Sequence, residues 1–221
     1  MSQDREVVLS GVIGPQWMGL IGNEMIESQM RAIASKGQRP ILRIHSEGGD
    51  LLEAMAIYAT VQRYDAEVRI ESLAASSASY VAMASRHVRI AENGLVMIHD
   101  PWVMAIGNAS ELRKIADTLD VHGDAVAQRY AAKANRDVDE VRRAMKKETW
   151  FTAQQALEWG LVDEVGPAQS TGQITISGRF CRQPPPQDLV QVAAPQETER
   201  DKMIRRLAAA VRNIRPLTTS M

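Results

Sequence analysis

The amino-acid sequence predicts an α/β fold with a mostly parallel sheet, and three observations support this. Short apolar and β-branched runs alternate with segments of helical periodicity over the first two thirds of the chain. The helical segments are about ten to fifteen residues long, which suits crossover helices between parallel strands. With 221 residues, of which 45% are hydrophobic and 24% charged, the chain can bury one core without disulfides.

Each early element follows from a local signal. The expected strands are apolar runs rich in β-branched residues, and they cover residues 6–13, 40–44, 67–73, 87–91 and 95–98. Gly14-Pro15 ends the first strand, and residues 46–49 (SEGG) are expected to form a turn after the second. The expected helices place apolar residues at helical spacing, and they cover residues 22–35, 51–62 and 76–84.

Capping signals then predict three further helices. Asn108 and Asp137 each precede a glutamate three residues later, the pattern of a capping box. They start helices that are expected to run to about residues 133 and 147. Thr152 caps a shorter helix that ends at Gly160. Residues 1–166 are thus expected to form one domain.

The composition changes after this domain. Residues 167–182 are expected to form a hairpin or extension, with a candidate strand at 171–180. The run QPPPQ at 183–187 predicts an extended linker, because proline fits neither a helix interior nor a sheet interior. The remainder of 183–221 is a basic tail whose segment 198–214 has amphipathic helical spacing. We interpret this tail as a solvated helix or docking arm rather than a nucleic-acid-binding element.

Composition also narrows the function classes. The 26 basic and 27 acidic residues give a net charge of −1, so no nucleic-acid partner is expected. The single cysteine, Cys181, excludes an intramolecular disulfide framework or multi-cysteine zinc site and fits a reducing compartment. No apolar run has the length of a membrane span, and the N-terminus lacks the pattern of a signal peptide. A soluble intracellular protein without a membrane partner is therefore expected.

Three segments carry residues suited to nucleophilic catalysis. Residues 74–79 (AASSAS) place serines where a predicted strand turns into a predicted helix, whose first N–H groups can stabilise an oxyanion. A tightly packed small-residue helix is an equally good interpretation. Residues 96–101 (VMIHDP) place a histidine between a strand and a proline loop, although a lone histidine is more often structural. Residues 43–49 (RIHSEGG) contain adjacent glycines that can direct backbone N–H groups into a site.

In this order and spacing, the three segments resemble the Clp protease family. The resemblance continues through residues 150–153 (WFTA) and 156–163 (ALEWGLVD) and covers residues 6–166. The segments SEGGD at 46–50, PW at 101–102 and ETWFT at 148–152 are most similar to the Clp-related head maturation proteases of tailed bacteriophages.

This resemblance implies a Clp/crotonase-type spiral of βαβ units with a helical extension, and serine endopeptidase activity. It makes Ser76 the nucleophile and His99 the general base. The backbone N–H groups of Gly49 and Ser77 would form the oxyanion hole. No metal or organic cofactor is required by such a mechanism.

The family's catalytic triad also contains a carboxylate that orients the histidine. Glu148 stands where the family usually has an aspartate, and a glutamate can also orient an imidazole. Asp100 and Asp124 are alternative orienting carboxylates. His45 replaces the asparagine of the family's Asn-Ser-Pro-Gly-Gly segment and is a second titratable group near the expected cleft, although a structural histidine at a strand end is the preferred interpretation.

The resemblance also implies partners. We expect a closed ring of identical subunits with a protein or peptide substrate, either a capsid or a scaffold protein, in the host cytoplasm or the phage prohead. The alternative within the enzyme class is a housekeeping Clp peptidase that works with an ATP-driven unfoldase. The alternative from another class is a non-catalytic ring or scaffold subunit.

Overall fold

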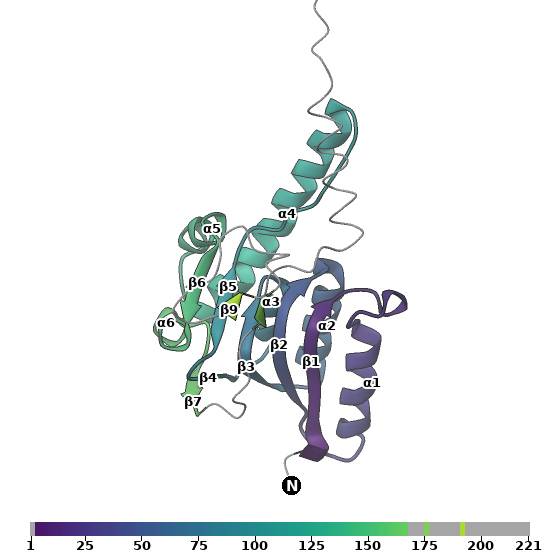
Figure 1. Ribbon diagram of the computed structural model, residues 1–221, viewed down its shortest axis with the longest axis vertical. Coiled ribbons are helices and arrows are strands. Elements are labelled where there is room, and N and C mark those ends of the chain that lie inside the picture. The colour runs from purple at the N-terminus through teal and green to yellow at the C-terminus, as the bar shows by residue number, and fades with distance from the viewer. Residues whose placement is uncertain (1–2, 168–174, 177–190, 193–221) are drawn as a thin grey trace, which may run out of the picture.

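The computed structural model describes residues 3–167, 175–176 and 191–192. Within these residues, seven strands form one sheet, and helices pack around it (Figure 1). The strands of this sheet are β1 Glu6–Ile13, β2 Ile41–Gly49, β3 Glu67–Ala75, β4 Val88–Ala91, β5 Leu95–Ile98, β6 Thr149–Thr152 and β7 Glu164–Gly166. The α-helices are α1 Asn23–Ala34, α2 Leu51–Arg63, α3 Ser77–Ala82, α4 Ala109–Ala134, α5 Val138–Lys146 and α6 Ala153–Trp159, and the 3₁₀ turns are η1 Gln3–Arg5 and η2 Gln16–Met18.

The sheet divides at β3. Its path runs β1-β2-β3-β4-β7, whereas β5 pairs with β3 and with β6. The first half of β3 pairs with β4 around Ile70, and its second half pairs with β5 around Ala74. Every pair in this sheet is parallel except β5–β6. The predicted α/β class with a mostly parallel sheet is therefore confirmed for the described residues.

One face of the sheet packs against helices α1 and α2 (Figure 1). The two helices contribute apolar side chains at helical spacing to the core, namely Ile26, Met30, Ile33, Ala54, Ile57 and Val61. The other face carries charges that are paired with one another. There, Arg43 bridges Glu6 and Glu71 on the two neighbouring strands. This pairing offsets part of the cost of their partial burial.

The predicted turn at residues 46–49 is wrong. These residues belong to β2, which continues to Gly49 and pairs there with Ile13 of β1. The register of β2 shifts on both sides near Ser46, whose Oγ donates to the Gly11 carbonyl oxygen at 2.5 Å. The paired glycines thus mark a strand irregularity rather than a chain reversal, because neighbours on both edges still satisfy the backbone.

Two short strands, β6 and β7, were absent from the sequence expectations. Strand β6 (TWFT) is rich in residues that favour strands, and it pairs with β5 in antiparallel fashion. Strand β7 extends the β4 edge in parallel. Strand β3 also runs two residues beyond the predicted end, so the helix that follows begins at Ser77 rather than Ser76.

All three helix starts are confirmed, but the capping box predicted at Asp137 is only half formed. Asn108 and Thr152 both form reciprocal capping boxes, with Glu111 and Gln155 respectively. Asp137 caps α5 by accepting from two backbone N–H groups, while the Glu140 carboxylate accepts a hydrogen bond from Arg136. Each cap satisfies backbone donors that the first helical turn leaves unpaired.

Helix α4 has two unlike halves and extends away from the sheet (Figure 1). Its buried residues all lie in its C-terminal half, between Gly123 and Ala134. The N-terminal half contributes none, and Leu112 and Val121 are exposed there. The first half of α4 is therefore a helical extension, a feature that the family resemblance implied without locating it.

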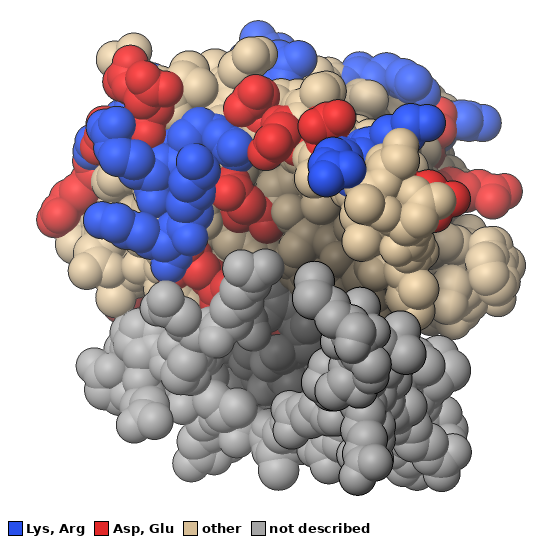
Figure 2. Space-filling model, turned by 90° about the horizontal axis from the view of Figure 1, so that it is seen from above, with Lys and Arg blue, Asp and Glu red and all other residues tan. Residues whose placement is uncertain are grey.

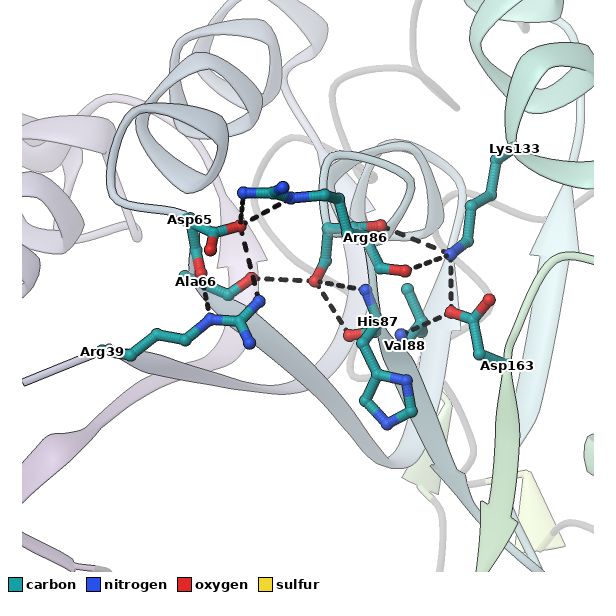
Figure 3. Close-up of polar contacts among 9 residues, drawn as sticks. Arg39, Asp65, Ala66, Arg86, His87, Val88, Lys133 and Asp163 are labelled. Atoms are coloured by element: carbon teal, nitrogen blue, oxygen red, sulfur yellow. Dashed lines mark hydrogen bonds and ion pairs between the residues drawn. The ribbon is translucent and has the colours of Figure 1, made fainter.

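The C-terminal half of α4 is joined to the loop between α3 and β4 by a polar network (Figure 3). Lys133 Nζ lies 2.6 Å from Asp163 Oδ2 and also donates to the carbonyl oxygens of Ser85 and Arg86. The same Asp163 oxygen accepts from the N–H of Val88 at 2.7 Å. This network fixes the chain beyond α3, and so it fixes one end of the short helix that follows Ser76.

The surface seen from above mixes both signs of charge. Basic side chains gather on the α5 side of the molecule, with acidic groups next to them (Figure 2). Helix α5 and the residue that follows it contribute exposed Arg143, Lys146 and Lys147. Among the described residues, no helix is long and apolar enough to span a membrane.

Little of the segment after residue 167 belongs to the described residues. Thr175–Ile176 (β8) lies within the candidate strand 171–180 and pairs in parallel with Gln191–Val192 (β9). The linker 183–187 and the amphipathic segment 198–214 lie outside the described residues, so the expectations for them remain predictions.

Candidate active site

Ser76 occupies the corner at which β3 ends and α3 begins. Its backbone has φ 56° and ψ −130°, which a residue with a side chain adopts only under constraint. The Ser76 N–H donates to the Met97 carbonyl oxygen on the adjacent strand β5, at 3.0 Å. A strained strand-to-helix corner of this kind presents a hydroxyl at the carboxyl edge of a parallel sheet.

His99 follows the strand next to Ser76. Ala75 and Met97 are register partners on the parallel strands β3 and β5, so both chains leave the sheet at the same edge. Ser76 Oγ and His99 Nε2 lie 2.7 Å apart. This distance is within the range expected of a nucleophile and its general base. The structure thus brings together the two residues that the sequence singled out.

Glu148 directly precedes β6, the antiparallel neighbour of β5. The last register pair of these strands is Ile98 with Thr149, so His99 and Glu148 are the next residues on the two paired chains. Glu148 is 6% exposed and has φ 52°. A buried glutamate and His99 therefore lie at the same end of the β5–β6 ladder.

Asp100 and Asp124, the alternative orienting residues, share a different partner. Arg142 of α5 lies 2.6 Å from the Asp100 carboxylate and 3.3 Å from that of Asp124. Its guanidinium also covers Gly123, where an added Cβ would lie 2.5 Å from Nη1. This contact holds the loop after His99 against α4 and α5. Both alternative carboxylates therefore form ion pairs with Arg142.

The glycine pair at the end of β2 packs closely against Ser76 on one side and Ile13 on the other. A Cβ at Gly48 would lie 2.8 Å from Ser76 Cβ and 2.9 Å from Ser77 N. A Cβ at Gly49, which has φ 147°, would lie 2.0 Å from the Ile13 carbonyl oxygen. Side chains at these positions would push the strands apart, so glycine is required for the close approach.

The two serines that follow Ser76 differ from it in accessibility. Ser77 lines the cleft described below, and its Oγ donates to the Gly49 carbonyl oxygen at 3.3 Å. Ser79 is fully buried, with its Oγ 2.7 Å from the Met97 carbonyl oxygen. Ser79 is therefore enclosed in the protein interior rather than presented to a substrate.

A cleft of about 440 Å³ opens beside Ser76 and His99. Gly49 and Ser77 also line it, so four of the five site residues predicted from the sequence meet there. Its other walls are mostly apolar and come from the end of β1, the η2 segment that follows it, the start of α2, the loop after His99 and α4. They include Met18, Leu20, Leu52, Trp102, Met104 and Val126. Such a cleft suits an apolar side chain of an extended chain.

His45 lies away from this cleft. It sits on β2, and its Nδ1 contacts the hydroxyl of Ser72 on β3. Neither residue is among those that line the cleft. The prediction that His45 is a second titratable group near the cleft is therefore wrong.

Sequence reasoning missed several residues at the site. Tyr130 lines the cleft from α4, and its hydroxyl lies 2.7 Å from Ser79 Oγ. Trp102 and Met104 form part of the apolar wall. The apolar run at residues 102–104 after Pro101 was a usable signal, because a contiguous exposed apolar patch often marks a binding site. No local signal pointed to Tyr130, because its partner is 51 residues away.

A serine–histidine contact at a strained strand-to-helix corner, next to an apolar cleft, is the arrangement used by serine hydrolases. A profile of the Clp protease family matches residues 2–169. The chain belongs to the Clp protease family. Its mixed α/β architecture is consistent with the fold of that family, and membership supports a serine peptidase function.

Two curated relatives are similar over most of the chain. The ATP-dependent Clp protease proteolytic subunit 2 of Thermobifida fusca (strain YX) is 32% identical over 158 residues, covering 69% of this chain and 78% of the relative. The ATP-dependent Clp protease proteolytic subunit of Ligilactobacillus salivarius (strain UCC118) is 28% identical over 168 residues, covering 74% and 83% respectively.

Proposed function

We propose that this protein is a serine endopeptidase with Ser76 as nucleophile and His99 as general base. The observation that carries the proposal is the 2.7 Å contact between Ser76 Oγ and His99 Nε2 at the edge of the cleft. His99 takes the hydroxyl proton while Oγ bonds to the carbonyl carbon of the substrate. It then gives this proton to the amine as the C–N bond breaks. Water, deprotonated by His99, releases the acyl group as a carboxylic acid and restores Ser76.

Backbone N–H groups stabilise the oxyanion of each tetrahedral intermediate in this proposal. Ser77 begins α3, and Gly49 ends β2 next to it at the cleft, with the Ser77 Oγ 3.3 Å from the Gly49 carbonyl oxygen. Preorganised donors in such positions contribute several kcal/mol, about 2.7–4 kcal/mol per donor in a well-studied protease. Glu148 orients the imidazole and stabilises its protonated form, which the β5–β6 register and its burial support.

Hydrolysis of fluorogenic peptides by the purified protein tests the proposed chemistry. A set of peptides that differ in one apolar position should be cleaved at unequal rates, because the cleft walls are mostly apolar. Wild-type protein that cleaves none of them, and whose Ser76 remains unmodified by a serine-directed inhibitor, would favour the non-catalytic ring or scaffold subunit instead.

The biological substrate is a second part of the proposal. The motifs SEGGD, PW and ETWFT support a capsid or scaffold substrate during phage head maturation. The names of the two curated relatives, both ATP-dependent Clp protease proteolytic subunits, favour a housekeeping peptidase that works with an unfoldase. Cleavage of a capsid or scaffold precursor without ATP supports the first role. Cleavage of folded protein only with ATP and an unfoldase supports the second.

Assembly follows from the same proposal. A closed ring of identical subunits would enclose the clefts and restrict access to unfolded segments. The exposed apolar residues near the cleft rim and on α4, including Trp17, Ile106, Leu112 and Val121, support burial against other copies. Analytical ultracentrifugation should show a closed oligomer, and a monomer at micromolar concentration would contradict this part.

A further inference from the structure

The carbonyl group of Ser76 is surrounded by hydrogen-bond donors. The backbone N–H groups of Ser79 and Tyr80 donate to its oxygen at 3.0 and 3.2 Å. Ser79 Oγ lies 2.7 Å from this oxygen, and the Tyr130 hydroxyl donates to it at 3.4 Å. Helical bonding accounts for the two backbone donors, but the two hydroxyl groups come in addition to it.

These two hydroxyl groups form a buried pair. Tyr130 is 1% exposed and Ser79 is fully buried, and their oxygens lie 2.7 Å apart. Ser79 Oγ also lies 2.7 Å from the carbonyl oxygen of Met97, which accepts the Ser76 N–H. The pair therefore contacts the Ser76 carbonyl oxygen and also the Met97 carbonyl oxygen, which accepts the hydrogen bond from the Ser76 N–H. Fully paired buried networks of this kind rigidify their surroundings.

The direction of the Ser76 carbonyl fixes the direction of the next N–H. The described chain contains no cis peptide bond, and in a planar trans peptide the C=O and the following N–H point in opposite directions. The Ser76 oxygen points to the interior pair of hydroxyls, so the Ser77 N–H points to the opposite side. Ser77 lines the cleft, and the Gly48 backbone closely approaches its nitrogen.

We infer that Ser79 and Tyr130 are positioning residues that hold the Ser76–Ser77 peptide in its reactive orientation. The pair maintains the uncommon Ser76 conformation, which is unfavourable by itself. It keeps Ser76 Oγ directed at His99 and the Ser77 N–H directed at the developing oxyanion. Neither residue touches the reacting atoms. The inference rests on the proposed function. The Ser79–Tyr130 contact joins α3 to α4.

The Tyr130 hydroxyl can serve this role at any working pH. Burial raises the pKa of Tyr130 above its ordinary value, and the hydrogen bond to Ser79 lowers it only in part. The neutral hydroxyl is thus retained as a donor while the imidazole of His99 titrates. Removing it should change the maximal rate of hydrolysis but leave the midpoint of the pH–rate profile in place.

Three single variants test the pair. Tyr130→Phe and Ser79→Ala each remove one hydroxyl, and Tyr58→Phe removes a tyrosine hydroxyl outside the network, on a ring stacked 4.8 Å from Tyr80. We expect kcat to fall between about tenfold and 100-fold in the first two variants, with KM nearly unchanged. Affinity for a peptide boronate, which mimics the tetrahedral intermediate, should fall by a similar factor. Tyr58→Phe should keep wild-type kcat.

The double variant Ser79→Ala/Tyr130→Phe should lose little more activity than either single variant, because the two hydroxyls act as one unit. Wild-type kcat in either single variant, or unchanged boronate affinity, would overturn the inference while leaving the proposed function intact. If one variant fails to fold by thermal denaturation, the other decides the matter. An inactive wild-type protein with unmodified Ser76 would overturn both.

Discussion

Among the described residues, two serine hydroxyls contact the ring nitrogen of a histidine, and the two pairs differ in nearly every other respect. Ser76 and His99 lie beyond the ends of neighbouring strands, next to the cleft. Ser72 and His45 lie within the strands β3 and β2. Both pairs have a hydroxyl against an imidazole nitrogen, so this contact by itself does not distinguish a catalytic site from a structural one.

The surroundings make the difference. Ser76 has positive φ and precedes a helix, whose first N–H groups can bind a negative charge. His99 meets Ser76 through Nε2, which leaves Nδ1 for an orienting group, whereas His45 meets Ser72 through Nδ1. The comparison teaches that catalytic potential depends on the strand end, the helix start and the cleft together.

The largest expected effect is that of Ser76→Ala. Loss of the nucleophile should reduce kcat for peptide hydrolysis by at least about 10⁴-fold, as for other serine proteases. Fold and assembly should persist, because the change removes one small polar atom. The steady-state rate of peptide cleavage is the measurement, with circular dichroism as a check of the fold. Full activity here, combined with loss in Ser72→Ala, would reverse the assignment of the two pairs.

Glu148→Gln should have the next largest effect. If this carboxylate orients His99, the amide favours the wrong tautomer, and kcat should fall between about 10²- and 10⁴-fold while KM changes little. Asp100→Asn and Asp124→Asn are matched controls, because both carboxylates contact Arg142 instead. A loss below about tenfold, or a larger loss in either control, would require another orienting residue.

Truncation after Arg182 should have a smaller effect that depends on the substrate. The proposed catalytic residues and the described residues that line the cleft lie between Val12 and Glu148, so small-peptide turnover should persist. Processing or retention of a protein partner should weaken, because we propose that 1–166 is the protease domain, 167–182 an extension and 183–221 a docking tail. Both activities are compared with those of the full chain. Loss of small-peptide turnover would show that the domain boundary is misplaced.

Ser72→Ala should have the smallest effect on catalysis. We expect kcat within about twofold of wild type, and a decrease of about 1 kcal/mol in the free energy of unfolding for one lost hydrogen bond. Denaturant titration gives the second quantity. His45→Gln is the companion variant and should behave similarly. A tenfold loss of kcat in both variants would mean that this pair also supports the reaction.

The sequence predicted the parallel architecture and the positions of Ser76 and His99 because those depend on local patterns. An apolar strand followed by a small-residue helix predicts a corner, and a strand followed by His99 and Pro101 predicts a side chain at the sheet edge. The error at Gly48 and Gly49 has a physical reason, since glycine permits both turns and strand irregularities. Pairing on both edges of β2 selected the latter.

Other features of the site depend on contacts between distant segments. The burial of Ser79 against Tyr130 joins α3 to α4, and Arg142 joins α5 to Asp100, so neither follows from a local pattern. Glu148 directly precedes β6, a four-residue strand too short for a clear periodicity. The family resemblance alone supplied this residue, and its role stays a prediction.

The central claim is that His99 activates Ser76 and no other serine. A fluorophosphonate probe reacts with activated serines, and peptide mapping by mass spectrometry identifies the modified residue. The account predicts a single adduct on Ser76, formed at a rate that falls at least about 100-fold in His99→Ala and is unchanged in His45→Gln. No adduct under these conditions, or an adduct on Ser72 that depends on His45, would contradict it.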